Sequence, residues 1–223
     1  MTLKTPLKLS SIPTLDTLLR TFPGVNTFLF DMDGTLFDTE KYHAHALIQI
    51  GIKYQINPPY PPQMVHDLMI GKADHLVFEL IRSWDNFPKE WVLADFLNEK
   101  NNLLLEAFAK EKNTNYFSHS MNSLLQEIKN KQYFVGLVTS SEKVVTKALL
   151  KHTGLEGFFN LELTRDDCPQ HKPDPWPYKK AMEMAHSDIH ETLIFEDSVV
   201  GLTAATSSGA HVVKVIWYQG FKI

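Results

Sequence analysis

The sequence predicts an α/β fold, in which a Rossmann-like parallel sheet is interrupted after its first strand by a large helical insert. Short apolar runs of Val, Ile, Leu and Phe recur along the chain without alternating polar residues, which is typical of strands buried on both faces of a parallel sheet. Helix-like stretches separate these runs, as they do in βα units. The first two runs, however, stand about 100 residues apart, several times the ~30 residues of one βαβ unit.

Five runs are predicted as strands because they are short and continuously apolar. They are Thr27–Phe30, Tyr133–Val138, Phe159–Leu163, Thr192–Phe195 and His211–Trp217. A helix is predicted before each of the last four strands, at Met121–Lys131, Glu142–His152, Trp176–His186 and Val199–Ser208. Gly154 and Gly209 follow two of these helices, at the position where a glycine commonly ends a helix.

The insert between the first two strands is predicted to be helical. Its helices are expected at Tyr42–Tyr54, Gln63–Met69, His75–Trp84, Trp91–Asn98 and Asn102–Lys110. The chain therefore divides into an N-terminal extension (1–26), an α/β core (27–40 and 116–223) and a helical domain (41–115). We expect the two linkers between core and helical domain at Asp38–Lys41 and Asn113–Ser118.

The N-terminal extension is predicted to carry a short amphipathic helix. Its apolar residues Leu15, Leu18, Leu19 and Phe22 follow the i, i+3, i+4, i+7 spacing of one helix face, and Thr14 is placed to cap it. Packing on the fold is the favoured role, and targeting or self-association stay open as alternatives.

Composition and charge exclude several classes of protein. With 43% apolar and 22% charged residues, the chain has the balance of a globular protein, not of a disordered one. A net charge of −4 and a pI of about 6.2 argue against nucleic acid or an anionic membrane as partner. The single cysteine, Cys168, excludes an intramolecular disulfide. We expect a cytoplasmic protein without a membrane span, and nothing in the sequence demands more than a monomer.

Residues suited to binding a metal and a phosphate follow four of the predicted strands. In an open parallel sheet, ligands bind outside the carboxyl ends of the strands. The residues found there are Asp31, Asp33, Thr139, Ser140, Lys172, Glu196 and Asp197. Clustered carboxylates repel one another, and a hard divalent cation such as Mg²⁺ removes that cost because it prefers oxygen ligands. The pattern therefore predicts Mg²⁺-dependent phosphoryl transfer.

The chemistry assigns a separate role to each of these residues. Asp31, ionised beside the metal and Lys172, is expected to be the nucleophile that forms an aspartyl-phosphate. Asp33 is expected to offer its backbone carbonyl to the metal, and its carboxyl to protonate the leaving group and then activate water. Lys172, the Thr139 hydroxyl and the backbone N–H of Ser140 are expected to hold the phosphate oxygens.

The same residues lie in four motifs that resemble those of the haloacid dehalogenase (HAD) superfamily. The motifs are Phe30-Asp31-Met32-Asp33-Gly34-Thr35-Leu36, Val138-Thr139-Ser140-Ser141, His171-Lys172-Pro173-Asp174-Pro175 and Phe195-Glu196-Asp197-Ser198. Their order and spacing agree with that superfamily over residues 27–218. The segment 38–43, Asp-Thr-Glu-Lys-Tyr-His, is similar to the β-phosphoglucomutase/phosphatase-like branch.

The resemblance implies a HAD-like core, a cap domain formed by the helical insert, bound Mg²⁺ and an aspartyl-phosphate intermediate. It also implies metal contacts at Asp31, the Asp33 carbonyl and Asp197. Glu196 is expected next to these ligands, acting on the metal through water or through another ligand.

We therefore expect a Mg²⁺-dependent phosphatase that hydrolyses a small phosphorylated metabolite, with sugar phosphates among the candidates. One alternative is a β-phosphoglucomutase-like phosphosugar mutase, which would use the same residues. The segment 71–76 lacks the arginine that is usual after the cap glycine in such mutases, and this disfavours the mutase. The other alternative is a non-catalytic phosphate-binding protein. It is disfavoured because no expected catalytic residue is substituted.

Overall fold

The structure is a computed structural model that describes residues 5–60, 64, 74–111 and 116–218. Apart from Met64, the helix predicted at Gln63–Met69 lies outside the described residues, as do Gly71 and Lys72. The chain forms two compact units, which we describe separately: an α/β unit of residues 1–38 and 114–223, and a helical unit of residues 39–113.

The α/β unit is built on one six-stranded sheet in the order β1-β6-β5-β2-β3-β4, with every neighbouring pair parallel. The strands are β1 (Leu7–Leu9), β2 (Thr27–Phe30), β3 (Phe134–Val138), β4 (Leu161–Leu163), β5 (Thr192–Glu196) and β6 (His211–Val215). The predicted α/β fold class with a parallel sheet is therefore confirmed. The expected strands are all present, although four of them differ from the prediction by one or more residues at an end.

The central strand β2 lies between β5 and β3, and all four of its residues are buried. The rings of Phe30 and Phe195, side by side on β2 and β5, stack with centroids 4.5 Å apart. Each ring belongs to the residue directly before an acidic residue, Phe30 before Asp31 and Phe195 before Glu196. The ends of β2 and β5 are therefore anchored in the core, and the residues that come next start from fixed positions.

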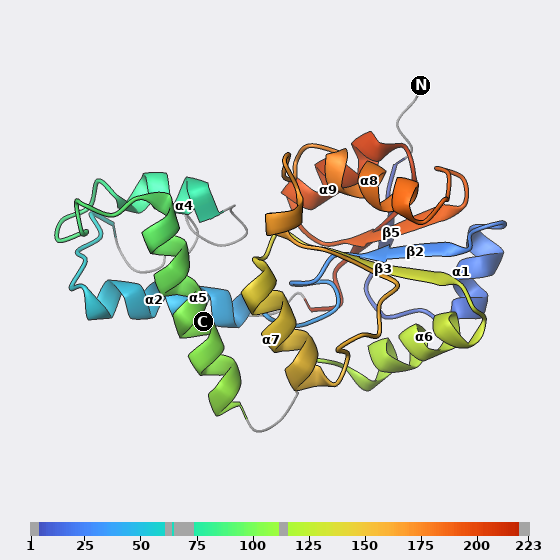
Figure 1. Ribbon diagram of the computed structural model, residues 1–223, viewed down its shortest axis with the longest axis horizontal. Helices are drawn as coiled ribbons and strands as arrows, with labels where there is room; N and C mark the ends of the chain where they lie inside the picture. Colours follow the sequence, from blue (N-terminus) through green and yellow to red (C-terminus); the bar gives the residue numbers. More distant parts are fainter. Residues whose placement is uncertain (1–4, 61–63, 65–73, 112–115, 219–223) are drawn as a thin grey trace. The chain divides into compact units, whose positions relative to one another are not determined.

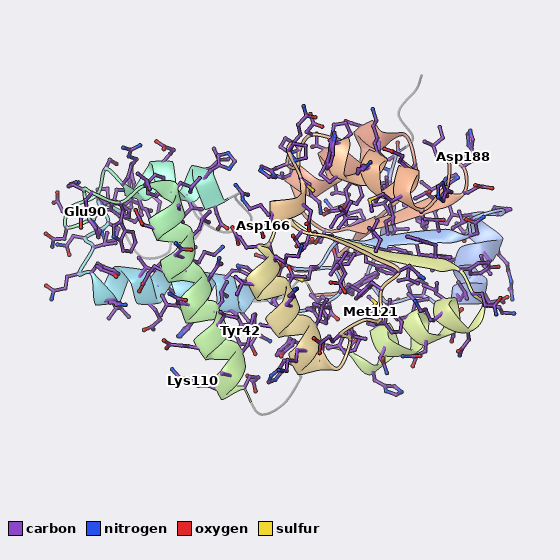
Figure 2. All side chains as sticks on the ribbon, in the orientation of Figure 1. Tyr42, Glu90, Lys110, Met121, Asp166 and Asp188 are labelled. Atoms are coloured by element: carbon purple, nitrogen blue, oxygen red, sulfur yellow. The ribbon has the colours of Figure 1, made fainter. Side chains whose placement is uncertain are left out.

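Helices cover both faces of this sheet. They are α1 (Leu15–Thr21), α6 (His119–Asn130), α7 (Lys143–Thr153), α8 (Trp176–Met184) and α9 (Val199–Ser208), with a short 3₁₀ turn, η1, at Arg165–Asp167. Figure 1 shows α8 and α9 on one face of the sheet and α1, α6 and α7 on the other. Met121, labelled in Figure 2, points from α6 toward the sheet and is fully buried.

Local signals in the sequence explain where several helices begin and end. The Thr14 hydroxyl accepts the N–H of Thr17 at 3.3 Å, so Thr14 caps α1 as predicted. Gly154 ends α7 and Gly209 ends α9, both in the left-handed conformation that glycine adopts without strain. At the other end of α9, the Ser198 hydroxyl accepts the N–H of Gly201 at 2.9 Å. This cap fixes the turn that immediately follows β5.

In its described residues, the helical unit contains α2 (Glu40–Lys53), α4 (Asp74–Ile81) and α5 (Leu93–Lys110), and both α2 and α4 pack against α5. Its apolar core includes the buried residues Ile50, Phe78, Trp84 and Phe96. Figure 2 shows Tyr42 on α2 and Lys110 at the end of α5. The Tyr42 hydroxyl donates to the Glu111 carboxylate at 2.9 Å, which joins the two ends of this unit.

The described helices α2 and α4 differ from the prediction only in where they begin and end, whereas α5 joins two predicted helices. Helices were expected at Trp91–Asn98 and Asn102–Lys110, whereas α5 continues through both. Of the polar residues between them, Lys100 and Asn101 are buried, and Lys100 forms an ion pair with Asp74. Because these polar side chains are enclosed by packing, the apparent break in the apolar pattern does not end the helix.

The N-terminal extension contributes more than the predicted helix. Residues Leu7–Leu9 form β1, which pairs in parallel with β6 at the edge of the sheet, with Leu7 opposite Val213 and Leu9 opposite Val215. A strand of three residues carries too little periodicity to be recognised in the sequence. Among the residues that the structure describes, no helix has both the length and the apolar character needed to cross a membrane.

Candidate active site

The predicted site residues lie at the carboxyl ends of the parallel strands. Asp31 directly follows β2, Thr139 directly follows β3, and Glu196 is the last residue of β5, with Asp197 next to it. Lys172 comes from the loop between η1 and α8. The structure brings the side chains of Asp31, Lys172 and Glu196 into direct contact, although 165 residues separate the first from the last.

The Lys172 ammonium lies at the centre of the site. Its Nζ is 2.7 Å from Asp31 Oδ1 and 2.7 Å from Glu196 Oε1, and it also donates to the Val138 carbonyl oxygen at 2.9 Å. All three of its hydrogens therefore have partners, and only 7% of the residue is exposed. Burial alone would lower the pKa of Lys172, but the carboxylates of Asp31 and Glu196 raise it above its usual value. This lysine is a fixed positive charge.

Glu196 is held entirely by protein donors. Its Oε1 accepts from Lys172 Nζ and from the Tyr178 hydroxyl, each at 2.7 Å. Its Oε2 accepts the Asp197 N–H at 3.1 Å and the Ser198 hydroxyl at 3.3 Å. The residue is fully buried. Because each of its oxygens already accepts two hydrogen bonds, Glu196 is suited to positioning Lys172 more than to binding a ligand directly.

Tyr178 was not predicted as a site residue. It lies on α8, is fully buried and donates to Glu196, while the Lys172 ammonium lies 4.9 Å from the centre of its ring. Burial and the Glu196 charge raise the pKa of the Tyr178 hydroxyl well above its usual value, so it remains a donor. Nothing in the sequence distinguishes this tyrosine from an ordinary core residue of an amphipathic helix.

Three carboxylates form an acidic cluster. Oxygens of Asp31, Glu196 and Asp197 lie within 4.8 Å of one another. Burial raises the pKa of the Asp31 carboxyl well above its usual value, and the charges of Glu196 and Asp197 raise it further against the opposing effect of Lys172. One ammonium does not balance three carboxylates, so the cluster has an excess of negative charge. Oxygen donors with such an excess fit a hard divalent cation.

The loop after β2 is shaped around Asp197. Gly34 has a φ of +76°, a conformation that favours glycine, and a Cβ added there would overlap the Asp197 carboxylate. The Thr35 hydroxyl donates to Asp197 Oδ1 at 3.2 Å. The loop therefore both leaves room for this carboxylate and helps to hold it.

The loop after β3 contributes hydroxyl groups. The Thr139 hydroxyl accepts the N–H of Ser141 at 3.0 Å, which leaves its own hydrogen to be donated elsewhere, and only 4% of Thr139 is exposed. The neighbouring Ser140 is exposed. The Ser141 hydroxyl, which was not predicted as a site residue, donates to Asp33 Oδ2 at 2.6 Å.

These features define an α/β protein with an acidic cluster at the carboxyl edge of a parallel sheet, where a buried lysine contacts two of the three carboxylates. The sequence pattern of the haloacid dehalogenase-like hydrolases matches residues 28–215. The chain therefore belongs to the haloacid dehalogenase-like hydrolase family, as its motifs predict.

One curated relative is similar in sequence, and two solved structures are similar in fold. The pyrophosphatase PpaX of Bacillus mycoides is 28% identical over 196 residues, which cover 86% of this chain and 84% of that protein. Among solved structures, CbbY of Rhodobacter sphaeroides in complex with phosphate has a TM-score of 0.74 at 21% identity, covering 89% of this chain and 90% of that one. A β-phosphoglucomutase of Clostridium difficile has a TM-score of 0.71 at 22% identity, covering 87% and 86%.

Proposed function

We propose that this protein is a Mg²⁺-dependent phosphatase that hydrolyses a small phosphorylated metabolite through an aspartyl-phosphate on Asp31. The observation that carries the proposal is the contact of Lys172 with both Asp31 and Glu196. A carboxylate at a strand end is suited to receive a phosphoryl group when a buried ammonium lies beside it. The ammonium stabilises the negative charge that accumulates on the transferred group. Membership of a hydrolase family supports the same conclusion.

The acidic cluster supports the metal requirement. Asp31 and Asp197, together with the backbone carbonyl of Asp33, would hold the ion, which supplies charge neutralisation and orients the phosphate when bound. Glu196 is not needed as a direct ligand because its oxygens are already occupied by protein donors.

The reaction would proceed in two steps on this chain's own residues. In the first, an Asp31 oxygen forms a bond to phosphorus while the bond to the leaving oxygen breaks and the Asp33 carboxyl gives that oxygen a proton. In the second, the Asp33 carboxylate takes a proton from water, whose oxygen attacks phosphorus and releases Asp31. The Thr139 hydroxyl and the Ser140 N–H would donate to the remaining phosphate oxygens in both steps. Lys172, whose three hydrogens already have protein partners, would contribute its positive charge beside them.

Two relatives suggest which phosphorylated compounds this chain hydrolyses. The relative PpaX is named a pyrophosphatase, and CbbY has been solved with xylulose-1,5-bisphosphate. These names make inorganic pyrophosphate and sugar phosphates the first candidates for this chain. We propose that the helical unit serves as a cap that selects among them, since it is inserted between β2 and β3 and so directly follows the loop of Asp31 and Asp33.

The experiment is phosphate release from pyrophosphate, sugar phosphates, nucleotides and small phosphorylated acids, with Mg²⁺ or with EDTA. We expect Mg²⁺-dependent release that falls below a few per cent in Asp31→Asn. Asp16→Asn is the matched control, because Asp16 is an exposed aspartate on α1, and it should match the wild type.

Two other outcomes would overturn the proposal in different directions. Conversion of a hexose 1-phosphate, without phosphate release and only when a sugar bisphosphate is added, would identify a phosphomutase. No turnover of any phosphoester by a folded protein would identify a phosphate-binding protein without catalytic activity.

A further inference from the structure

The residues that follow β6 also lie at the carboxyl edge of the sheet, because β6 runs parallel to β5. The sequence predicted that this strand extends to Trp217, whereas β6 ends at Val215. Trp217 and Tyr218 therefore leave the sheet at the same edge as the residues that follow β2 and β5. The phosphatase proposal assigns no role to either of these aromatic residues.

Both aromatic residues donate hydrogen bonds to the loop that follows β2. The Trp217 Nε1–H donates to the carbonyl oxygen of Thr35 at 2.9 Å, and the Tyr218 hydroxyl donates to the carbonyl oxygen of Leu36 at 3.1 Å. Thr35 and Leu36 are fully buried, and buried carbonyl groups need donors. Two consecutive residues after β6 thus supply donors to two consecutive residues of the first motif, which stand 182 residues earlier in the chain.

The two donor side chains are themselves held within the α/β unit. The Trp217 ring lies near the Phe195 ring of β5, with the ring centroids 6.4 Å apart. Burial raises the pKa of the Tyr218 hydroxyl, and hydrogen bonds from the side chain and the backbone of Ser118 lower it. Because the Tyr218 oxygen receives these hydrogens, its own hydrogen is directed to the Leu36 carbonyl.

The loop that receives these hydrogen bonds is closed by bonds within its own backbone. The Gly34 N–H donates to the Phe37 carbonyl oxygen at 2.8 Å. The N–H groups of Leu36 and Phe37 donate to the Met32 carbonyl oxygen at 2.9 and 3.0 Å. A shift of Thr35 or Leu36 would therefore also displace the backbone around Gly34.

Thr35 connects this loop to the acidic cluster. Its carbonyl oxygen accepts from Trp217, and its hydroxyl donates to Asp197 Oδ1 at 3.2 Å. Asp197 is one of the three carboxylates that form the cluster. A continuous path of hydrogen bonds therefore leads from the indole of Trp217 through Thr35 to a carboxylate that is proposed to hold the metal ion.

We propose that Trp217 and Tyr218 are positioning residues that hold the loop after β2, so that Thr35 keeps Asp197 in place for a divalent cation. This inference rests on the proposed Mg²⁺-dependent function. Neither aromatic side chain has to touch the ion or the substrate, because each acts through a backbone carbonyl group. Ligands that are already in position bind more tightly than ligands that must first be ordered. The aromatic pair should therefore increase the affinity for the cation as well as the stability of the fold.

The experiment compares Trp217→Phe and Tyr218→Phe with the wild type. Each replacement removes one hydrogen-bond donor and keeps an aromatic ring. The main measurement is the Mg²⁺ dissociation constant, obtained without substrate from the rise of the Tm with Mg²⁺ concentration. The second is the Mg²⁺ concentration that gives half-maximal phosphate release. We expect both values to rise roughly two- to tenfold in Trp217→Phe, the contribution of one hydrogen bond, and to rise in Tyr218→Phe as well.

A double-mutant cycle with Thr35→Val tests the path through Thr35. Valine has nearly the shape of threonine but lacks the hydroxyl that donates to Asp197. If Trp217 acts on Asp197 through Thr35, the Mg²⁺ dissociation constant of the double variant should increase by less than the product of the two single increases. An increase equal to that product would show independent effects and would overturn the inference.

Two replacements are matched controls. Trp91→Phe changes a tryptophan of the helical unit, whose ring contacts those of Tyr54 and Phe87. Tyr133→Phe removes a hydroxyl directly before β3, at the amino end of the sheet. Neither control should change the Mg²⁺ dissociation constant.

The outcomes separate this inference from the proposed function. A lower Tm in EDTA with an unchanged Mg²⁺ dissociation constant, in both Trp217→Phe and Tyr218→Phe, would show a purely structural role and overturn the inference. Phosphate release by the wild type would then leave the phosphatase proposal intact. A wild type with neither a Mg²⁺-dependent rise in Tm nor phosphate release would overturn the proposed function itself. Tyr218→Phe loses a single oxygen atom, so it decides the question even if Trp217→Phe does not fold.

Discussion

The strongest stability prediction concerns Glu196→Gln. The replacement has nearly the same shape, but it removes the charge and substitutes an NH₂ donor for one of the two oxygens. Each oxygen of Glu196 accepts two hydrogen bonds, so the new NH₂ must face two donors wherever it points. The change also leaves Lys172 with one fewer carboxylate in a buried site. Removing one partner of a buried ion pair costs about 3–5 kcal/mol in the free energy of unfolding.

For a chain of this size, a loss of about 3–5 kcal/mol corresponds to a decrease in Tm of about 6–20 °C, at roughly 2–4 °C per kcal/mol. The assay is thermal and urea unfolding in EDTA, so that no metal bound at the cluster contributes. Glu183→Gln is the control, because Glu183 forms an exposed ion pair with Lys180 at 3.0 Å. Exposed pairs of this kind contribute about 0–1 kcal/mol. A Glu196→Gln protein within about 1 kcal/mol of the wild type would refute the reasoning, because the buried network would then contribute little to stability.

Three further predictions concern the same unit. Folding raises the pKa of the Asp31 carboxyl, so Asp31 stabilises the folded state at low pH, where it is protonated. This stabilisation is lost as the pH rises through the raised pKa. In EDTA, the Tm of the wild type minus that of Asp31→Asn should therefore fall with rising pH, and a constant difference would contradict this. Gly34→Ala should reduce kcat at least about tenfold by displacing Asp197. Gly24→Ala is the control, because Gly24 also has a positive φ but nothing lies within 4 Å of the added Cβ, so this variant should change stability and not kcat. Equal kcat values for the two variants would contradict the prediction for Gly34. Deleting residues 1–9 should lower the Tm, because β6 loses its edge partner, while phosphate release is retained; an unchanged Tm would contradict this.

The convergence of the site could be predicted from the sequence because it depends on topology. Parallel strands all end at one edge of the sheet, so residues that follow β2, β3 and β5 must meet there once the strands are recognised. Asp31 and Glu196 are the clearest example, since each stands at the end of a continuously apolar run. Lys172 was also predicted from its place after a strand, although a longer loop separates it from the end of β4.

The features that were missed depend on side-chain packing or on very short elements. Tyr178 reaches Glu196 from a helix whose sequence pattern marks it only as core. Ser141 contacts Asp33 through a rotamer that no sequence pattern specifies. The continuity of α5 depends on the burial of Lys100 and Asn101 inside the helical unit. In each case the deciding contact joins residues that are distant in the sequence, so local periodicity carries no information about it.

The site also explains why two glycines stand opposite Glu196, the last residue of β5, and Asp197, which follows it. A Cβ at Gly34 would overlap the Asp197 carboxylate. Likewise, a Cβ at Gly201, in the first turn of α9, would overlap the Glu196 carboxylate. Both carboxylates thus occupy space that any other residue would fill. The position of the acidic cluster is therefore determined by the shape of the surrounding backbone as much as by the charge of Lys172.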